Sequence, residues 1–171
     1  MRPVITLTGA WLLAAPVCAQ LSEHVGVYLE VLPPALRVTV TSARVDFGQQ
    51  RANAGRVVLD PATGEISRKA AGRHQVGQVQ VTGRAGTAYA IDVATSPFLH
   101  SSRARIGYGL RWAQSMDCTG SGYEAIVSPR MVTGLLGQSG CSSLRFGGAI
   151  ALDSAAEGRY EGNLQVRIVT L

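Results

Sequence analysis

Short runs in which apolar and polar residues alternate cover most of this chain. The clearest run lies at its C-terminal end. There, mostly apolar residues at every second position from Tyr160 to Thr170 alternate with mostly polar residues. A repeat of two residues is typical of a β-strand with one buried face. This final strand has no closing partner after it, which leaves open what covers the strand beside it. We expect an extended segment from the N-terminal end of a chain to provide that cover.

Similar runs predict strands through most of the remaining sequence. They lie at residues 36–40, 57–59, 78–82, 89–93, 106–112, 123–127 and 144–152, separated by turn residues. No segment after residue 19 shows the 3.6-residue period of an amphipathic helix. The pattern therefore predicts an all-β protein, an immunoglobulin-like antiparallel β-sandwich of about 7–9 short strands. It leaves open whether this sandwich lacks its last strand.

Two irregularities predict bends within strands. The apolar positions shift by one residue between Val40 and Ala43, which predicts a bulge or a bend at this point. The Gly147 and Gly148 pair interrupts one long apolar run and predicts a bend there. Trp112, in the aromatic strand, is expected to be a core residue.

Turn sequences predict two hairpins. The DPATG sequence at 60–64 favours a tight turn leading to Ile66, because proline fixes φ early in the turn and glycine tolerates positive φ. The GRAG sequence at 83–86 joins the strands predicted at 78–82 and 89–93. A four-residue connection that contains glycine predicts that these two strands pair as a hairpin.

The N-terminal residues have the features of a secretory signal peptide. Arg2 precedes an apolar stretch at 4–16, and small residues follow at 17–19. This stretch is shorter than the roughly 20 apolar residues that span a membrane. We therefore predict that residues 1–19 are removed and that the mature chain begins at Gln20.

Residues 20–34 are predicted to form an extended N-terminal arm that precedes the sandwich domain at 35–171. Alternating apolar residues make one face of this arm a candidate donor strand; they are Val25, Val27, Leu29 and Val31. The Pro33 and Pro34 pair cannot continue a ladder of hydrogen bonds and separates the arm from the domain. The alternative is that the arm is an ordinary first edge strand of its own domain.

Composition argues against several classes of protein. Sixteen basic residues face eleven acidic ones, and the excess is scattered rather than clustered. No segment combines a basic patch with aromatic residues, as a nucleic-acid-binding surface would. We expect neither nucleic-acid binding nor a membrane-spanning segment in the mature chain.

The two cysteines that remain after cleavage, Cys118 and Cys141, predict one disulfide in an oxidising compartment. Three histidines, His24, His74 and His100, lie far from one another and from the cysteines in sequence. This spacing does not match a metal site. No metal or other cofactor is expected.

Catalytic motifs are not found. The GQSGC sequence at 137–141 approaches a nucleophile elbow, but cysteine stands where the last glycine is required. Three aspartates, Asp92, Asp117 and Asp153, lie beside strand ends or turns, where carboxylates often cap the backbone. The sequence therefore does not predict an enzyme.

Several short glycine-based motifs carry a resemblance to a known family. They are Asp46-Phe47-Gly48, the VVLDPATG block at 57–64, Gly83, Gly147-Gly148 with Ile150 and Leu152, and Gly158-x-Tyr160-x-Gly162 leading to Val166 and Ile168. From Val38 to Leu171 the chain resembles exported proteobacterial domains of unknown function. That family is similar to chaperone–usher pilin subunits, including spore coat U-like subunits. The cysteines lie away from the first strand, where a pilin usually carries its bridge.

The resemblance implies an immunoglobulin-like sandwich in the periplasm or at the cell surface, with no catalytic residues. We expect a structural or adhesive subunit of a fimbria-like assembly, joined to like subunits by donor-strand addition. A periplasmic chaperone and an outer-membrane usher are further candidate partners. A monomeric secreted or periplasmic binding module is the alternative, and an enzyme of unrecognised type is the third.

Overall fold

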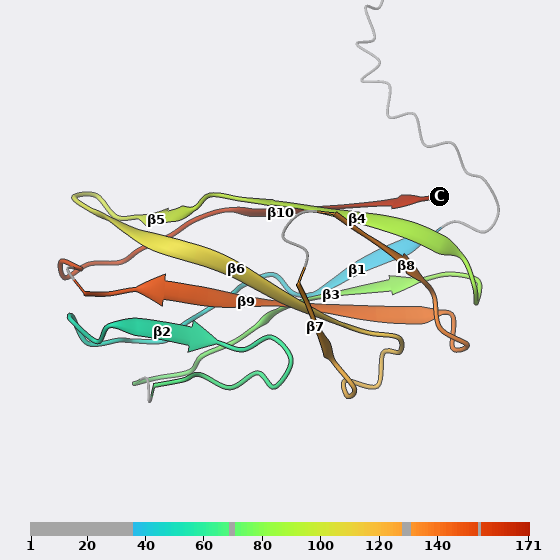
Figure 1. The fold of residues 1–171 in the computed structure, drawn as a ribbon, viewed down its shortest axis with the longest axis horizontal. Helices are drawn as coiled ribbons and strands as arrows, with labels where there is room; N and C mark the ends of the chain where they lie inside the picture. Colours follow the sequence, from blue (N-terminus) through green and yellow to red (C-terminus); the bar gives the residue numbers. More distant parts are fainter. Residues whose placement is uncertain (1–35, 69–70, 128–130, 154) are drawn as a thin grey trace, which may run out of the picture. The chain divides into compact units, whose positions relative to one another are not determined.

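The computed structural model describes residues 36–171 except 69–70, 128–130 and 154. Within these residues it contains ten β-strands and no helix (Figure 1). The strands are β1 (Arg37–Ser42), β2 (Arg56–Leu59), β3 (Gly77–Thr82), β4 (Ala88–Thr95), β5 (Phe98–His100), β6 (Arg105–Ser115), β7 (Glu124–Ile126), β8 (Met131–Leu135), β9 (Cys141–Ala151) and β10 (Leu164–Thr170). The predicted all-β class is confirmed. The predicted signal peptide and arm lie outside the described residues.

The larger sheet is built around β9, an 11-residue strand (Figure 1). On one side β9 pairs first with β3 and then with β2, and on its other side it pairs with β6. The strands β1, β5 and β7 extend the sheet outward from β3 and β6. All of these pairings are antiparallel.

Two glycines let β9 change partners in the middle of its length. Gly147 and Gly148 lie where β3 ends and β2 begins to pair. A Cβ atom on Gly148 would lie 2.7 Å from the carbonyl oxygen of Gly109 and would also overlap the Tyr108 ring. The predicted single strand across the glycine pair is confirmed, whereas the predicted bend stays a prediction. The glycines are needed because neighbouring backbone and ring atoms approach closely.

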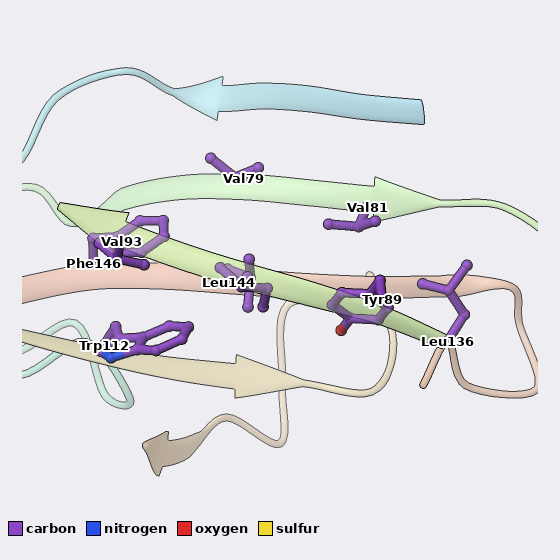
Figure 2. Packing of buried hydrophobic residues seen from close by; sticks show 9 residues of the cluster. Val79, Val81, Tyr89, Val93, Trp112, Leu136, Leu144 and Phe146 are labelled. Carbon is purple, nitrogen blue, oxygen red and sulfur yellow. The ribbon is translucent and has the colours of Figure 1, made fainter. Parts of the chain in front are cut away.

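The smaller sheet contains three strands in the order β10-β4-β8 and packs on the larger sheet. Between them lies a core of buried side chains from both sheets: Val79, Val81, Tyr89, Ile91, Val93, Trp112, Leu136, Leu144 and Phe146. Figure 2 shows these side chains gathered between β4 and the strands of the larger sheet. The predicted core position of Trp112 is confirmed, since it is 1% exposed.

A second cluster of buried residues lies against another part of the larger sheet. It consists of Phe47, Val57, Leu59, Ile106, Ile150 and Leu152. Partly buried residues from loops pack on it, among them Val45, Val76, Ala155 and Tyr160. Loop segments, rather than strands of the smaller sheet, therefore cover much of this second cluster.

The hairpin predicted at 83–86 is wrong, because β3 and β4 belong to different sheets. The Gly83 N–H donates to the Gly140 carbonyl at 2.9 Å, and the Gly86 N–H donates to the Leu136 carbonyl at 2.9 Å. The connection therefore bonds to the segment between β8 and β9 and not across itself. It carries the chain from one layer to the other, so that the apolar rows of β3 and β4 face each other across the core.

The other local predictions hold. The register of β1 against β3 shifts between Val40 and Ser42, where the sequence predicts a bulge or bend. In the DPATG turn, the Gly64 N–H donates to the Asp60 carbonyl at 2.8 Å. The second arm of that hairpin is reduced to a single bridge between Leu59 and Ile66.

A small polar network is buried inside the apolar core. Tyr89 donates its hydroxyl hydrogen to Ser142 Oγ at 2.8 Å, and Ser142 donates to the Ser115 carbonyl at 2.9 Å. Gln114 Nε2 donates to the Tyr89 hydroxyl at 2.7 Å. Because each of these groups finds a partner, the smaller sheet is joined to the larger one by polar bonds without a large desolvation penalty.

The predicted disulfide between Cys118 and Cys141 is confirmed. The two Cα atoms lie 5.8 Å apart, within the usual range for a disulfide. The bond ties the loop that follows β6 to the first residue of β9. The same loop is held by Ser115, whose hydroxyl donates to the Ser121 carbonyl at 2.8 Å, and by Arg145, whose guanidinium lies 3.9 Å from the centre of the Tyr123 ring.

Candidate functional site: an apolar groove between two strand edges

A groove of about 1700 Å³ opens between the edge of the larger sheet and the edge of the smaller one. On one side it is lined by Val38 and Val40 of β1, and on the other by Leu164 and Val166 of β10. These strands come from opposite ends of the described chain. The groove is therefore an opening between the two layers of the sandwich.

Apolar side chains, of the kind usually buried in a core, are exposed to solvent in this groove. Val38 and Val40 are 47% and 58% exposed, although they line the same groove as the buried residues Val79 and Phe146. Their partners in register on β3 are Val81 and Val79, which are 0% and 7% exposed. One row of apolar residues is thus covered on β3 and open to solvent on β1, one strand further out.

The backbone of β1 also faces outward at these valines. The bond from Gly83 N–H to Gly140 continues the β3–β9 ladder and fixes which residues of β3 bond to β9. Alternate residues of an antiparallel ladder bond to opposite sides. It follows that Val38 and Val40 point their N–H and C=O groups away from β3, toward the open edge.

The edge of β10 is built in the same way. The Leu171 N–H donates to the Ala88 carbonyl at 3.1 Å, in line with the β10–β4 register. By the same alternation, Leu164, Val166 and Ile168 direct their backbone groups away from β4. Their side chains pack against the core. No described strand pairs with the outer edge of β1 or of β10.

The two strands that border the groove run in opposite directions. In Figure 2, β3 runs from Val79 to Val81 and β4 runs the other way, from Tyr89 to Val93. Each is antiparallel to its edge strand, β1 to β3 and β10 to β4. A strand inserted in the groove would therefore be antiparallel to one border and parallel to the other.

Beyond these two strands the groove continues between loops at 43–52 and 155–163. Here Asp46 bridges Gln75 and Glu161 bridges His100. This part of the groove contains the Tyr108 side chain, whose hydroxyl donates to the Gly147 carbonyl at 2.9 Å. Burial raises the pKa of Tyr108 to about 12. Of the segments that line the groove, β1 and β10 are strands at the ends of their sheets, and no described strand pairs with their outer edges.

The residues that sequence reasoning considered for other chemistry are dispersed. Asp117 accepts hydrogen bonds from the Thr119 N–H and hydroxyl, which lower its pKa and close a local turn. In the described part of the chain, no group of three or more His, Cys, Asp or Glu side chains is placed to hold a metal ion. In the same residues, no helix is long and apolar enough to cross a membrane.

The donor-strand candidates Val25, Val27, Leu29 and Val31 lie outside the described residues. The alternating pattern predicts an open position beside the last strand but does not identify the residues that form it. The structure supplies them: the two valines of β1 and the three apolar residues of β10. The sequence does indicate where the open edge of β1 ends. The apolar pattern shifts by one residue after Val40, and the regular pairing of β1 is interrupted at the same point.

Comparison with protein-family models finds no family that matches this chain, and comparison with curated proteins finds no relative. The resemblance to pilin-like domains therefore remains a prediction.

Proposed function

We propose that this chain is an exported structural or adhesive subunit of a fimbria-like surface assembly, in which subunits are joined by strand addition. The observation that carries the proposal is the groove, where two strand edges with outward backbone groups face each other and line the opening with the apolar side chains of Val38, Val40, Leu164 and Val166. An edge of this kind is a template for pairing with another chain. An extended peptide that enters it gains main-chain hydrogen bonds, and its alternate side chains gain apolar contacts.

The proposed occupant is the arm of a neighbouring copy, residues 20–34. Its apolar residues Val25, Val27, Leu29 and Val31 repeat every two positions, which is the spacing of side chains on one face of a strand. The contact joins two different surfaces, the arm of one copy and the groove of the next. A contact of this type builds an open fibre rather than a closed dimer.

Export to the periplasm or cell surface belongs to this proposal. The disulfide between Cys118 and Cys141 is compatible with it, because such bonds persist mainly in oxidising compartments. We propose a periplasmic chaperone and an outer-membrane usher as the partners that deliver the subunit to the assembly.

Deleting residues 20–32 tests the proposal directly. The exported chain should form multimers on an unboiled denaturing gel and in sedimentation, and the deletion variant should give monomers only. Within the arm, Val27→Asp or Leu29→Asp should weaken assembly far more than Tyr28→Ser, because position 28 falls on the other face.

The opposite result has a specific meaning. If the chain stays monomeric at high concentration and unfolds when the arm is deleted, the arm is an ordinary edge strand of its own domain. A monomeric secreted binding module would then replace the surface subunit as the proposed function.

A further inference from the structure

The chain enters β1 directly from the arm, and this limits how the arm can reach its own groove. Only residues 33–36 separate Leu32 from Arg37, the first residue of β1. Four residues span at most about 14 Å, whereas a six-residue strand is about 20 Å long. The arm therefore cannot pass to the far end of β1 and run parallel to it. Within one chain it can only turn back and run antiparallel to β1.

The length of this connection also fixes which side chains would face the groove. A four-residue loop places Val31 opposite Val38 and Leu29 opposite Val40. Residues directly opposite each other in an antiparallel pair project to the same face. The valine and leucine of the arm would thus enter the groove, and their backbone would meet the outward N–H and C=O groups of β1. A three-residue loop would instead direct Glu30 into the apolar groove.

We propose that each subunit, before assembly, covers its own groove with its arm in this hairpin register. The inference rests on the proposed function, since it assigns residues 20–34 to the same groove and adds a second way of filling it. The own arm and the neighbour's arm compete for one site. The groove is then closed in the free subunit and exchanges its strand on assembly.

The two ways of filling the groove differ in direction. Because β1 and β10 run in opposite directions, the subunit's own arm lies antiparallel to β1 and parallel to β10. A neighbour's arm is not tied to β1 and can lie antiparallel to β10, the more stable form of pairing per residue. The backbone groups of four β10 residues face outward, Leu164, Val166, Ile168 and Thr170, whereas within β1 only Val38 and Val40 do so. The neighbour's arm therefore pairs more favourably in the groove than the subunit's own arm. This difference favours replacement of the own arm by the neighbour's arm on assembly.

A pair of cysteines on the outer face of the hairpin tests this register. Thr39 bonds to β3 through its backbone, so Glu30 and Thr39 would form a non-hydrogen-bonded pair with Cα atoms about 4.5 Å apart. That spacing suits a disulfide. The full exported chain with Glu30→Cys and Thr39→Cys, isolated as a monomer and oxidised, should form a second bridge within one molecule. Mass spectrometry and a non-reducing gel identify it as a monomer that has lost two further hydrogens.

The matched control combines Glu30→Cys with Arg37→Cys. These positions are diagonal in the hairpin, about 7 Å or more apart, and should bridge poorly. As a second measurement, hydrogen exchange at the Val40 amide should be slower in the unassembled intact chain than in the chain lacking residues 20–32, because the arm would accept its hydrogen bond.

The outcomes separate the two proposals. Disulfide-linked ladders without an intramolecular bridge would overturn the hairpin and support the strand exchange between copies. Equal bridging in both cysteine pairs would also overturn the hairpin register. Absence of any bridge, together with unchanged Val40 exchange and unchanged oligomeric state after the deletion, would overturn the hairpin and the proposed function together.

Discussion

Gly134 in β8 is a residue whose small size the core requires. A Cβ atom at this position would lie 2.9 Å from the ring and hydroxyl of Tyr89 and 3.1 Å from Gln114 Nε2. Tyr89 and Gln114 are hydrogen-bonded to each other, so neither can move without breaking the buried polar network. The fit between the two sheets thus depends on a single missing methyl group.

We expect Gly134→Ala to lower the free energy of unfolding by about 1–3 kcal/mol, the usual cost of overfilling a packed core. Denaturant unfolding of the oxidised protein measures the change. Gly109→Ala is the matched control, because a Cβ atom there meets nothing within 4 Å and should leave stability nearly unchanged. Equal stability of the two variants would contradict the role given to Gly134.

Tyr108 predicts a dependence of stability on alkaline pH. Its pKa is about 12 in the folded chain, against an ordinary value of 10.0, because burial disfavours the charged phenolate. Above pH 10 the unfolded chain releases this proton while the folded chain keeps it, so stability falls as pH rises from 10 toward 12. Burial also raises the pKa of Tyr89, which adds to the same trend.

Replacing Tyr108 by phenylalanine should therefore make the fall in stability between pH 10 and 12 shallower. Unfolding free energies measured at a series of pH values give the slope, and the absorbance of tyrosinate follows the titration itself. Tyr108→Phe should cost about 1 kcal/mol at neutral pH, because the Gly147 carbonyl loses its hydrogen-bond donor. An unchanged slope would contradict the assignment.

At the scale of elements, the disulfide fixes one loop to the central strand. Cys141→Ser should lower the free energy of unfolding by roughly 3 kcal/mol in the chain-entropy model, since the bond closes a loop with a sequence separation of 23. The sandwich should still form, because the bridge lies outside the apolar cluster between the sheets. Unfolding curves with and without a reductant check both statements, and a loss of all strand signal on reduction would contradict the second.

The sequence predicts individual strands better than it predicts their partners. Alternation identifies β3, β4 and β6 because each buries one face, and this depends only on residues within the strand. Pairing depends on which layer a strand joins, and the apolar rows of β3 and β4 look the same in a hairpin as across a core. The connection at 83–86 therefore suggests a hairpin, whereas its N–H groups bond to residues 136 and 140, which are far away in sequence.

The candidate site is likewise only partly predictable from the sequence. Its apolar residues are visible in the sequence as alternating valines, leucine and isoleucine, but their exposure follows from the position of β1 and β10 at the sheet edges. Val81 and Val40 belong to equivalent patterns, and only the structure distinguishes the buried one from the open one. Alternation and the proline pair predict the arm, whereas its place in the groove is a proposal.

At the scale of the whole molecule, substitutions in the groove should affect assembly more than folding. Val40 is 58% exposed in the described domain, so Val40→Asp should change the stability of the chain lacking residues 20–32 little. In an assembled fibre the same carboxylate would be buried without a partner, and we expect at least a tenfold loss of affinity between copies. Thr39→Asp, on the other face of β1, is the control. Sedimentation of both variants over a range of concentrations compares them.

The central position of β9 has a consequence for folding, because its partners lie far from it in the sequence. The strands β2, β3 and β6 all pair with residues 141–151, which are made only after most of the chain. Pairings between residues so distant in sequence form slowly, because a long loop must close first. During that delay, strands from the first two thirds of the chain present unpaired edges to other molecules. The interval before β9 arrives is therefore when the protein is most exposed to misassembly, and when a binding partner would protect it most.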